Sequence, residues 1–116
     1  MKARKLIQAR KTATRVLRQR RRAVIRQLPD VEQILRGSLM ERYVTCGKPG
    51  CKCARGERHG PVWYLSVTLK ADQTVGMQVP AEQLELVRGW LENYRQLKQS
   101  LETICEINWE LLRRGR

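Results

Sequence analysis

Three cysteines and the only histidine of the chain lie within fourteen consecutive residues, from Cys46 to His59. The spacing C-x4-C-x-C-x5-H offers four side chains of the types that bind zinc in a tetrahedron. Glycines between and beside these residues allow the tight backbone turns that a local site needs. The sequence therefore predicts a zinc site whose ligands are Cys46, Cys51, Cys53 and His59.

Three other states of these thiols fit the segment less well. A disulfide between Cys51 and Cys53 has unfavourable geometry, and three clustered cysteines leave one unpaired. Free thiols are usually buried in apolar surroundings, whereas this segment is rich in Gly, Pro, Lys and Arg. An iron-sulfur cluster usually takes four cysteines, and the fourth, Cys105, is far along the chain.

A zinc ion with four protein ligands has no open position at which to activate water, so the predicted metal is structural. The only histidine is assigned to zinc, and no acidic cluster suggests a nuclease or recombinase. We therefore predict that the protein is not an enzyme. A metal with three protein ligands and a bound water would reopen that interpretation.

Four cations surround the predicted ligands: Lys48, Lys52, Arg55 and Arg58. Three thiolates and one divalent ion leave one net negative charge, which these cations can offset. The same side chains can instead form a phosphate-binding patch. The residues alone leave both interpretations open.

The charge of the 116-residue chain is concentrated at one end. The net charge is +13, and residues 1–28 hold eleven Lys or Arg and no Asp or Glu, so the remainder is nearly balanced. We predict a basic helical arm over residues 1–28, followed by a zinc-stabilised α+β domain over residues 29–116. No apolar run is long enough to span a membrane, and the cysteine usage fits a reducing cytosol.

The basic arm is predicted to be a helix because it contains good helix formers and no Gly or Pro. Its apolar residues form one narrow stripe, Leu6, Ala13, Leu17, Val24 and Leu28. The stripe can dock on the domain while the cations face a polyanion, most commonly nucleic acid. The predicted phosphate contacts are Arg15, Arg18, Arg20, Arg21, Arg22 and Arg26.

The basic arm has three alternative interpretations. A solvated basic face needs no partner. A basic amphipathic helix can lie on an anionic membrane, but this stripe lacks Trp and Phe. An organellar transit peptide is usually rich in Ser, and the arm has none.

The rest of the chain predicts a small antiparallel sheet of two or three strands, with the zinc segment between strands. Pro29 ends the arm, and Asp30 resembles the N-cap of a short helix that ends at Leu35 or Arg36. Residues 38–45 predict a strand. Clean alternation over residues 63–70 and 75–79 predicts a hairpin with one buried face, in which Trp63 is a core residue and Tyr64 points outward.

Pro80 is predicted to open a long C-terminal helix, whose apolar stripe is Leu84, Val87, Leu91, Tyr94, Leu97, Leu101, Ile104, Ile107 and Leu111. A helix of about 33 residues is roughly 50 Å long, more than a small sheet can cover. Part of the stripe must therefore pack on the arm, on the short helix or on a second copy of the chain. Cys105 is predicted to be a small core residue, and Trp90 and Trp109 to pack at the edges.

The runs Arg36 to Pro61, Trp63-Tyr64-Leu65-Ser66, Val79-Pro80 and Glu106-Ile-Asn-Trp-Glu-Leu-Leu resemble a family of short, uncharacterised, Cys-rich prokaryotic proteins. Proteins of that family are often encoded near insertion-sequence transposases. The resemblance covers residues 36–113 and implies a mobile-element setting, but it implies no mechanism.

Together these features predict a cytoplasmic, zinc-stabilised nucleic-acid-binding protein, acting as an accessory or regulatory factor of a mobile element. DNA would place it at the nucleoid. Because phosphate contacts give affinity without sequence information, we expect weak sequence specificity. The alternative function is a protein-interaction subunit that binds a transposase, or forms a homodimer, through the C-terminal helix.

Overall fold

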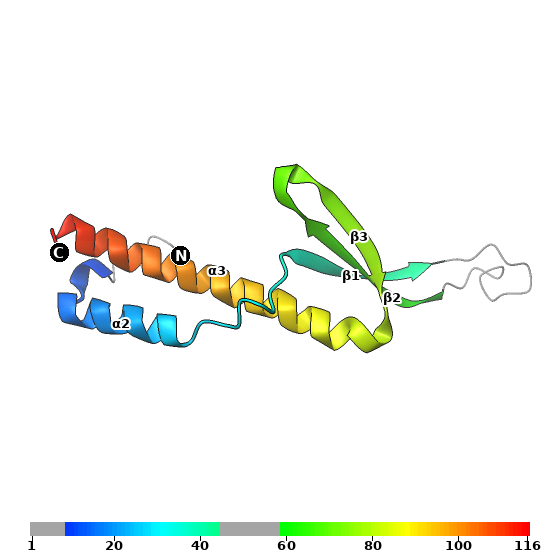
Figure 1. The fold of residues 1–116 in the computed structure, drawn as a ribbon, viewed down its shortest axis with the longest axis horizontal. Coiled ribbons are helices and arrows are strands. Elements are labelled where there is room, and N and C mark those ends of the chain that lie inside the picture. Colours follow the sequence, from blue (N-terminus) through cyan, green and yellow to red (C-terminus); the bar gives the residue numbers. More distant parts are fainter. Residues whose placement is uncertain (1–8, 45–58) are drawn as a thin grey trace, which may run out of the picture. The chain divides into compact units, whose positions relative to one another are not determined.

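The computed structural model describes residues 9–44 and 59–116, and it confirms an α+β fold. Helix α2 (Thr14–Arg26) is followed by strands β1 (Gly37–Val44), β2 (His59–Thr68) and β3 (Thr74–Val79) and by helix α3 (Leu84–Arg113) (Figure 1). These residues form two compact units. The helical unit comprises residues 9–33 and 93–116, and the sheet unit comprises Ile34–Glu92.

The sheet unit is a three-stranded antiparallel sheet with the order β1-β2-β3. Leu65 pairs with Leu39 on one side and Met77 on the other, so these three side chains share the inner face of the sheet. The first turns of α3 pack against this inner face and bury Leu65, Val67, Val79 and Val87. The predicted hairpin and the inward direction of its apolar residues are confirmed.

The ends of the hairpin differ in detail from the prediction. A single 3₁₀ turn, Lys70–Asp72, joins β2 to β3, and Ala71 and Asp72 both have a positive φ angle. Another 3₁₀ turn, Ala81–Gln83, precedes α3, so Pro80 lies before this turn and not at the first position of the long helix. At 30 residues, α3 is about 45 Å long.

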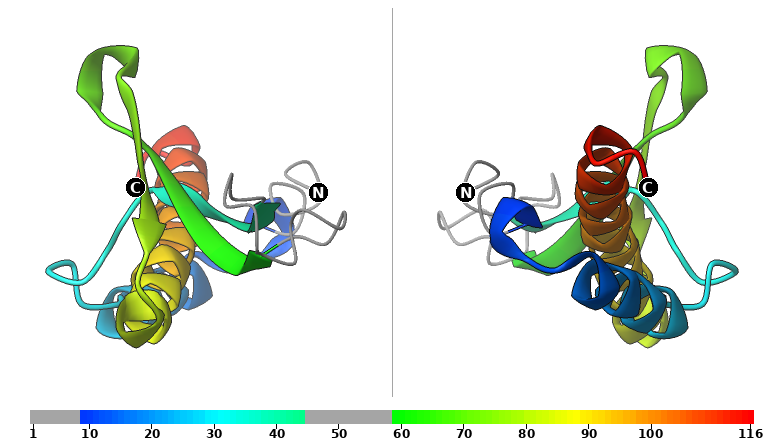
Figure 2. Two further views of the ribbon diagram at one scale, coloured as in Figure 1. Left: turned by 90° about the vertical axis from the view of Figure 1, so that its right-hand side faces the viewer. Right: turned by 90° about the vertical axis from the view of Figure 1, so that its left-hand side faces the viewer.

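In the helical unit, α2 lies beside the C-terminal part of α3 and runs antiparallel to it (Figures 1 and 2). Leu17 is 1% exposed and packs in one cluster with Ala9, Ile107 and Leu111. The predicted docking of the arm by its apolar stripe is confirmed at Leu17. Val24 and Leu28 are half-buried, Ala13 is exposed, and Leu6 lies outside the described residues.

The arm is not one continuous helix. Residues 9–11 are helical, but Ala13 is extended, with φ −62° and ψ 143°, and α2 begins only at Thr14. The predicted short helix after Asp30 is also wrong, because residues 31–33 form only a turn. The Asp30 carboxylate accepts a hydrogen bond from the Glu32 amide, while the Leu35 amide donates to the Trp90 carbonyl of α3. Bonding to α3 replaces the bonds that a helix would have made.

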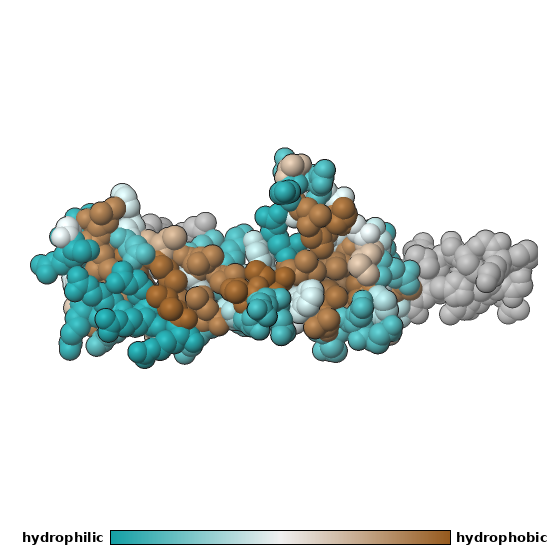
Figure 3. All heavy atoms as spheres, viewed as in Figure 1, coloured by the Kyte–Doolittle hydropathy of each residue, from teal (hydrophilic) through white to brown (hydrophobic). Residues whose placement is uncertain are grey.

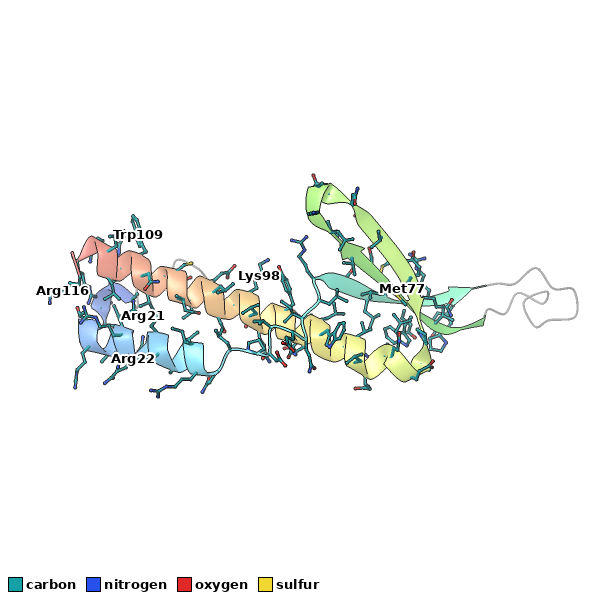
Figure 4. All side chains as sticks on the ribbon, in the orientation of Figure 1. Arg21, Arg22, Met77, Lys98, Trp109 and Arg116 are labelled. Atoms are coloured by element: carbon teal, nitrogen blue, oxygen red, sulfur yellow. The ribbon has the colours of Figure 1, made fainter. Side chains whose placement is uncertain are left out.

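Leu101 of the predicted stripe of α3 is exposed, and so are two residues near the stripe. Cys105 is a free, exposed cysteine, so the prediction of a core residue is wrong. Trp109 is also exposed, and Figure 4 shows it on the side of α3 away from α2. Among the described residues, no helix combines the length and apolar character that crossing a lipid bilayer requires.

Candidate nucleic-acid interface

Four arginines of α2 form one continuous row on the helix surface. Arg15, Arg18, Arg22 and Arg26 follow one another at steps of three, four and four residues, which places neighbours on the same side of a helix. We call this row the arginine face. All four side chains are exposed, whereas Leu17 on the opposite side of the helix is buried. Packing of the apolar side against α3 therefore turns the arginine face to solvent.

The arginine face has no countercharge within the described part of the chain. None of its four guanidinium groups has a hydrogen-bond or ion-pair partner there. Figure 3 shows hydrophilic residues along the outer edge of α2 and hydrophobic residues in the seam between α2 and α3. Like charges at these spacings repel one another, so a polyanion that neutralises them would stabilise the helix.

The other two predicted contacts of α2 differ from this row. Arg21 is half-buried, and its guanidinium donates a 2.7 Å hydrogen bond to the Asn108 side chain of α3. Figure 4 shows Arg21 between the two helices and Arg22 on the other side of α2. Arg20 is exposed but lies outside the row. The structure thus separates one arginine that links the helices from four that face solvent together.

A buried ion pair at the end of α3 holds the beginning of α2 in place. Glu110 is 1% exposed, and one of its oxygens accepts hydrogen bonds of 2.7 Å from both Arg113 and Arg114. Its other oxygen accepts a second bond from Arg113, at 3.1 Å. A buried carboxylate normally destabilises a fold, but two guanidinium groups compensate this charge.

Arg114 connects this ion pair to the break between residues 9–11 and α2. Its guanidinium donates to the carbonyls of Ala9 at 3.0 Å and Thr12 at 2.7 Å, and to the Thr14 hydroxyl at 3.0 Å. A cation is favourable beside the carbonyls at the C-terminal end of a helical turn, where the negative end of the helix dipole lies. Gly115, with φ 74°, closes the end of α3 immediately afterwards and so fixes where Arg114 lies.

The same contacts lower the pKa of Glu110. Hydrogen bonding from Arg113 is the largest cause, and together with Arg114 it outweighs burial and brings the pKa from 4.5 to about 2. A carboxylate whose pKa is lowered by folding stabilises the folded state above its unfolded pKa. That contribution is lost as the pH falls from about 4.5 toward about 2.

Most of the predicted zinc site falls outside the part of the chain that the structure describes. Cys46, Cys51 and Cys53, with Lys48, Lys52, Arg55 and Arg58, lie outside the described residues, as does the His59 side chain. The His59 backbone opens β2 and pairs with Val44 of β1. The strand ends that flank residues 45–58 are therefore paired with each other. Within the described residues, no group of three or more His, Cys, Asp or Glu could hold a metal ion.

Two groups of residues that meet in the structure were not predicted from the sequence. The Glu110–Arg113–Arg114 cluster could have been predicted from the sequence, because opposite charges three and four residues apart on a helix usually meet. By contrast, the guanidinium of Arg42 lies 4.4 Å from the centre of the Tyr64 ring. That contact joins two strands and depends on a register that the sequence does not specify.

We predict that Glu110→Gln lowers stability at neutral pH, because both arginines lose their charged partner. The difference in unfolding free energy from the wild type should be constant above about pH 5 and shrink as the pH falls toward 2. Denaturant unfolding followed by circular dichroism across this range measures it. Glu106→Gln, whose carboxylate makes no ion pair within the described residues, is the control. A difference between Glu110→Gln and wild type that does not vary with pH would contradict the assignment.

Comparison with known proteins agrees with an uncharacterised family. The family described as "Domain of unknown function (DUF6788)" matches residues 14–89. The match begins at the first residue of α2, so it includes the arginine face as well as the sheet, whereas the resemblance seen in the sequence began at residue 36. Neither the curated proteins nor the solved structures gave a match. Because the matched residues cover more than half of it, the chain belongs to the DUF6788 family.

Proposed function

We propose that this protein is a non-enzymatic nucleic-acid-binding protein that contacts phosphates through the arginine face of α2. The observation that carries the proposal is a row of four exposed arginines, with no ion-pair partner among the described residues, opposite a buried leucine. A helix surface without a binding role would be expected to carry acidic residues between the basic ones, but α2 contains no acidic residue. Neighbouring residues of the row are about 5–6 Å apart, a spacing that suits successive phosphates of one backbone.

The proposed binding is electrostatic and gives little sequence information. Arginine pairs with phosphate in a bidentate geometry and stays charged at every physiological pH. The affinity should therefore fall steeply as salt rises, because binding releases counterions from the nucleic acid. The resemblance to proteins encoded near transposases supports a role as an accessory or regulatory factor of a mobile element, in the cytoplasm. Lys48, Lys52, Arg55 and Arg58 are proposed as further phosphate contacts.

The double variant Arg18→Gln/Arg22→Gln should bind a DNA duplex more weakly than the wild type does. Each lost phosphate contact reduces the slope of log affinity against log salt by about 0.9, so we expect a reduction of about 1.8. Fluorescence anisotropy at several salt concentrations measures both affinity and slope.

The matched control is Lys98→Gln/Arg116→Gln, which removes two exposed cations of the same unit that lie outside the arginine face (Figure 4). We expect the control to retain most of the slope. Equal losses in the two double variants would mean that net charge, and not the arginine face, determines binding.

We also propose that Cys46, Cys51, Cys53 and His59 hold a structural zinc ion. The pairing of Val44 with His59 supports the proposal, because it brings together the strand ends that flank the cysteines. Bound zinc would crosslink this segment and stabilise a small domain with little core of its own. Four protein ligands would leave no open position for a substrate.

Elemental analysis should find one equivalent of zinc in freshly purified, reduced protein. Cys51→Ser should lose the zinc and unfold at a lower temperature, because a ligand is removed. Cys105→Ser is the matched control, since Cys105 is an exposed cysteine of α3 outside the segment, and it should keep its zinc. A metal-free wild-type protein that melts at the same temperature with and without added zinc would contradict this proposal.

A second candidate function, self-association through α3, is favoured by one observation. Leu101, Cys105, Trp109 and Leu112 are all exposed, and steps of four, four and three residues align them along one side of α3. Leu112 is 71% exposed. An apolar row of this kind on a helix is typical of a surface that another helix covers.

If a second copy covers this row, the wild type should sediment as a dimer and Leu112→Glu as a monomer. A charge within an apolar contact loses its hydration without gaining a partner. Leu86→Glu, at another exposed leucine of the same helix, is the control and should remain dimeric. Monomeric wild-type protein at high concentration would exclude this function.

A further inference from the structure

The outer face of the sheet, opposite the side that α3 covers, has an unusual composition. The strand register places Arg42, Tyr64, Ser66 and Gln78 on this face. Tyr64 is its only aromatic residue within the described strands, and the remaining side chains are hydroxyl-bearing or apolar, among them the exposed Met40, which pairs directly with Tyr64. The described strand residues contribute no carboxylate to this face, because Glu41 pairs with Trp63 on the inner side.

Two neighbours hold the Tyr64 ring in place. The Arg42 guanidinium lies over the ring, 4.4 Å from its centre, in a cation–π contact. On β3, the ring extends across Gly76, where an added Cβ would lie only 2.7 Å from ring carbon Cζ. A glycine at this position thus gives the ring room to lie against the sheet. Arg42 is exposed, so a planar cation on a planar ring faces solvent.

A polar hollow begins beside this stack. It has a volume of about 550 Å³ and is lined in part by Arg36, Ser38, Ser66 and Lys70. Ser66 is the next residue after Tyr64 on the same face, about 7 Å along the strand. The Arg36 guanidinium donates a 2.6 Å hydrogen bond to the Thr68 carbonyl, and its other N–H groups have no partner within the described residues.

The charge of the hollow favours an anion. Arg36 and Lys70 contribute two positive charges, and Asp72 is the one carboxylate among the lining residues. Two serine hydroxyls add further hydrogen-bond donors. A phosphate group would find both cationic and neutral donors there.

We propose that the outer sheet face binds single-stranded nucleic acid, with one base stacked on the Arg42–Tyr64 pair and a neighbouring phosphate in the hollow. Both parts are close enough for one nucleotide and its neighbour to reach. Stacking needs an unpaired base, because the bases of a duplex are already stacked on one another. The inference rests on the proposed function in one respect, that the ligand is nucleic acid, but it assigns a separate surface and a preference for single strands.

The test compares a short oligothymidylate with an abasic strand of the same length, which has the phosphates without the bases. The wild type should bind oligothymidylate more tightly by about 5- to 150-fold, the range that one stacked base contributes. Tyr64→Leu should lose this preference while its affinity for the abasic strand stays the same. Tyr64→Phe keeps the ring and should retain the preference.

Two further variants act on the stack without removing the ring. Gly76→Ala should reduce the preference, because its new methyl group displaces the ring. Arg42→Lys should reduce it as well, because it keeps the charge but loses the planar group. Thermal melting of each variant verifies that the fold is intact.

The outcomes separate this inference from the proposed function. Equal affinity of the wild type for both strands, or an unchanged preference in Tyr64→Leu, would overturn the stacking site even if the arginine face binds duplex. The stacking site would also be overturned if the wild type showed no base preference and an acidic peptide displaced both strands equally. The double variant Arg18→Gln/Arg22→Gln should lower the affinity for both strands by the same factor. The ratio of the two affinities should therefore stay unchanged. A base preference that depends on Tyr64 supports the site whether or not the arginine face binds.

Discussion

The helical unit depends on the buried pairing of Glu110 with Arg114. This pair connects the end of α3 to the break that precedes α2, because Arg114 also bonds to the backbone carbonyls of Ala9, Arg10 and Thr12 and to the Thr14 hydroxyl. Loss of one partner would leave a buried charge uncompensated, which generally destabilises more than the pair itself stabilises. The pairing thus fixes where α2 begins and, with Leu17, which side of α2 faces solvent.

The arginine face is a source of internal repulsion that the packing of α2 has to offset. Isolated short helices are marginal in water, and like charges three and four residues apart weaken them further. Burial of Leu17 among Ala9, Ile107 and Leu111 supplies stabilisation that the isolated helix lacks. A polyanion that bound this row would not have to order the helix first, because packing against α3 already orders it.

The sequence predicted the strands of the sheet well, because the alternation of apolar and polar residues along a strand shows directly which side is buried. The hairpin of β2 and β3 and the strand before them were confirmed. Contacts distant in sequence account for the errors. The break at Ala13 follows from Arg114, about a hundred residues away, and the turn after Asp30 follows from the bond between Leu35 and Trp90. Cys105 matched an apolar position, yet only the placement of α2 decides which side of α3 is covered.

The candidate site was likewise predictable where it depends on local sequence, and unpredictable where it depends on contacts between distant residues. Charge alone identified the arginines of α2, but packing was needed to separate Arg21, which bonds to Asn108, from the four that face solvent. The stack of Arg42 on Tyr64 needs both the strand register and the space at Gly76, and neither follows from the residues of one strand. The predicted zinc ligands remain a prediction from spacing, supported by the pairing of Val44 with His59.

The central claim, that the arginine face binds phosphates, is tested most directly by a titration of ¹⁵N-labelled protein with a short DNA duplex. Nuclear magnetic resonance then follows the guanidinium Nε–Hε signals of arginine. We expect the signals of Arg15, Arg18, Arg22 and Arg26 to shift together, while that of Arg114, bonded within the protein, stays in place. Shifts spread evenly over all arginines, or confined to residues outside α2, would contradict the account.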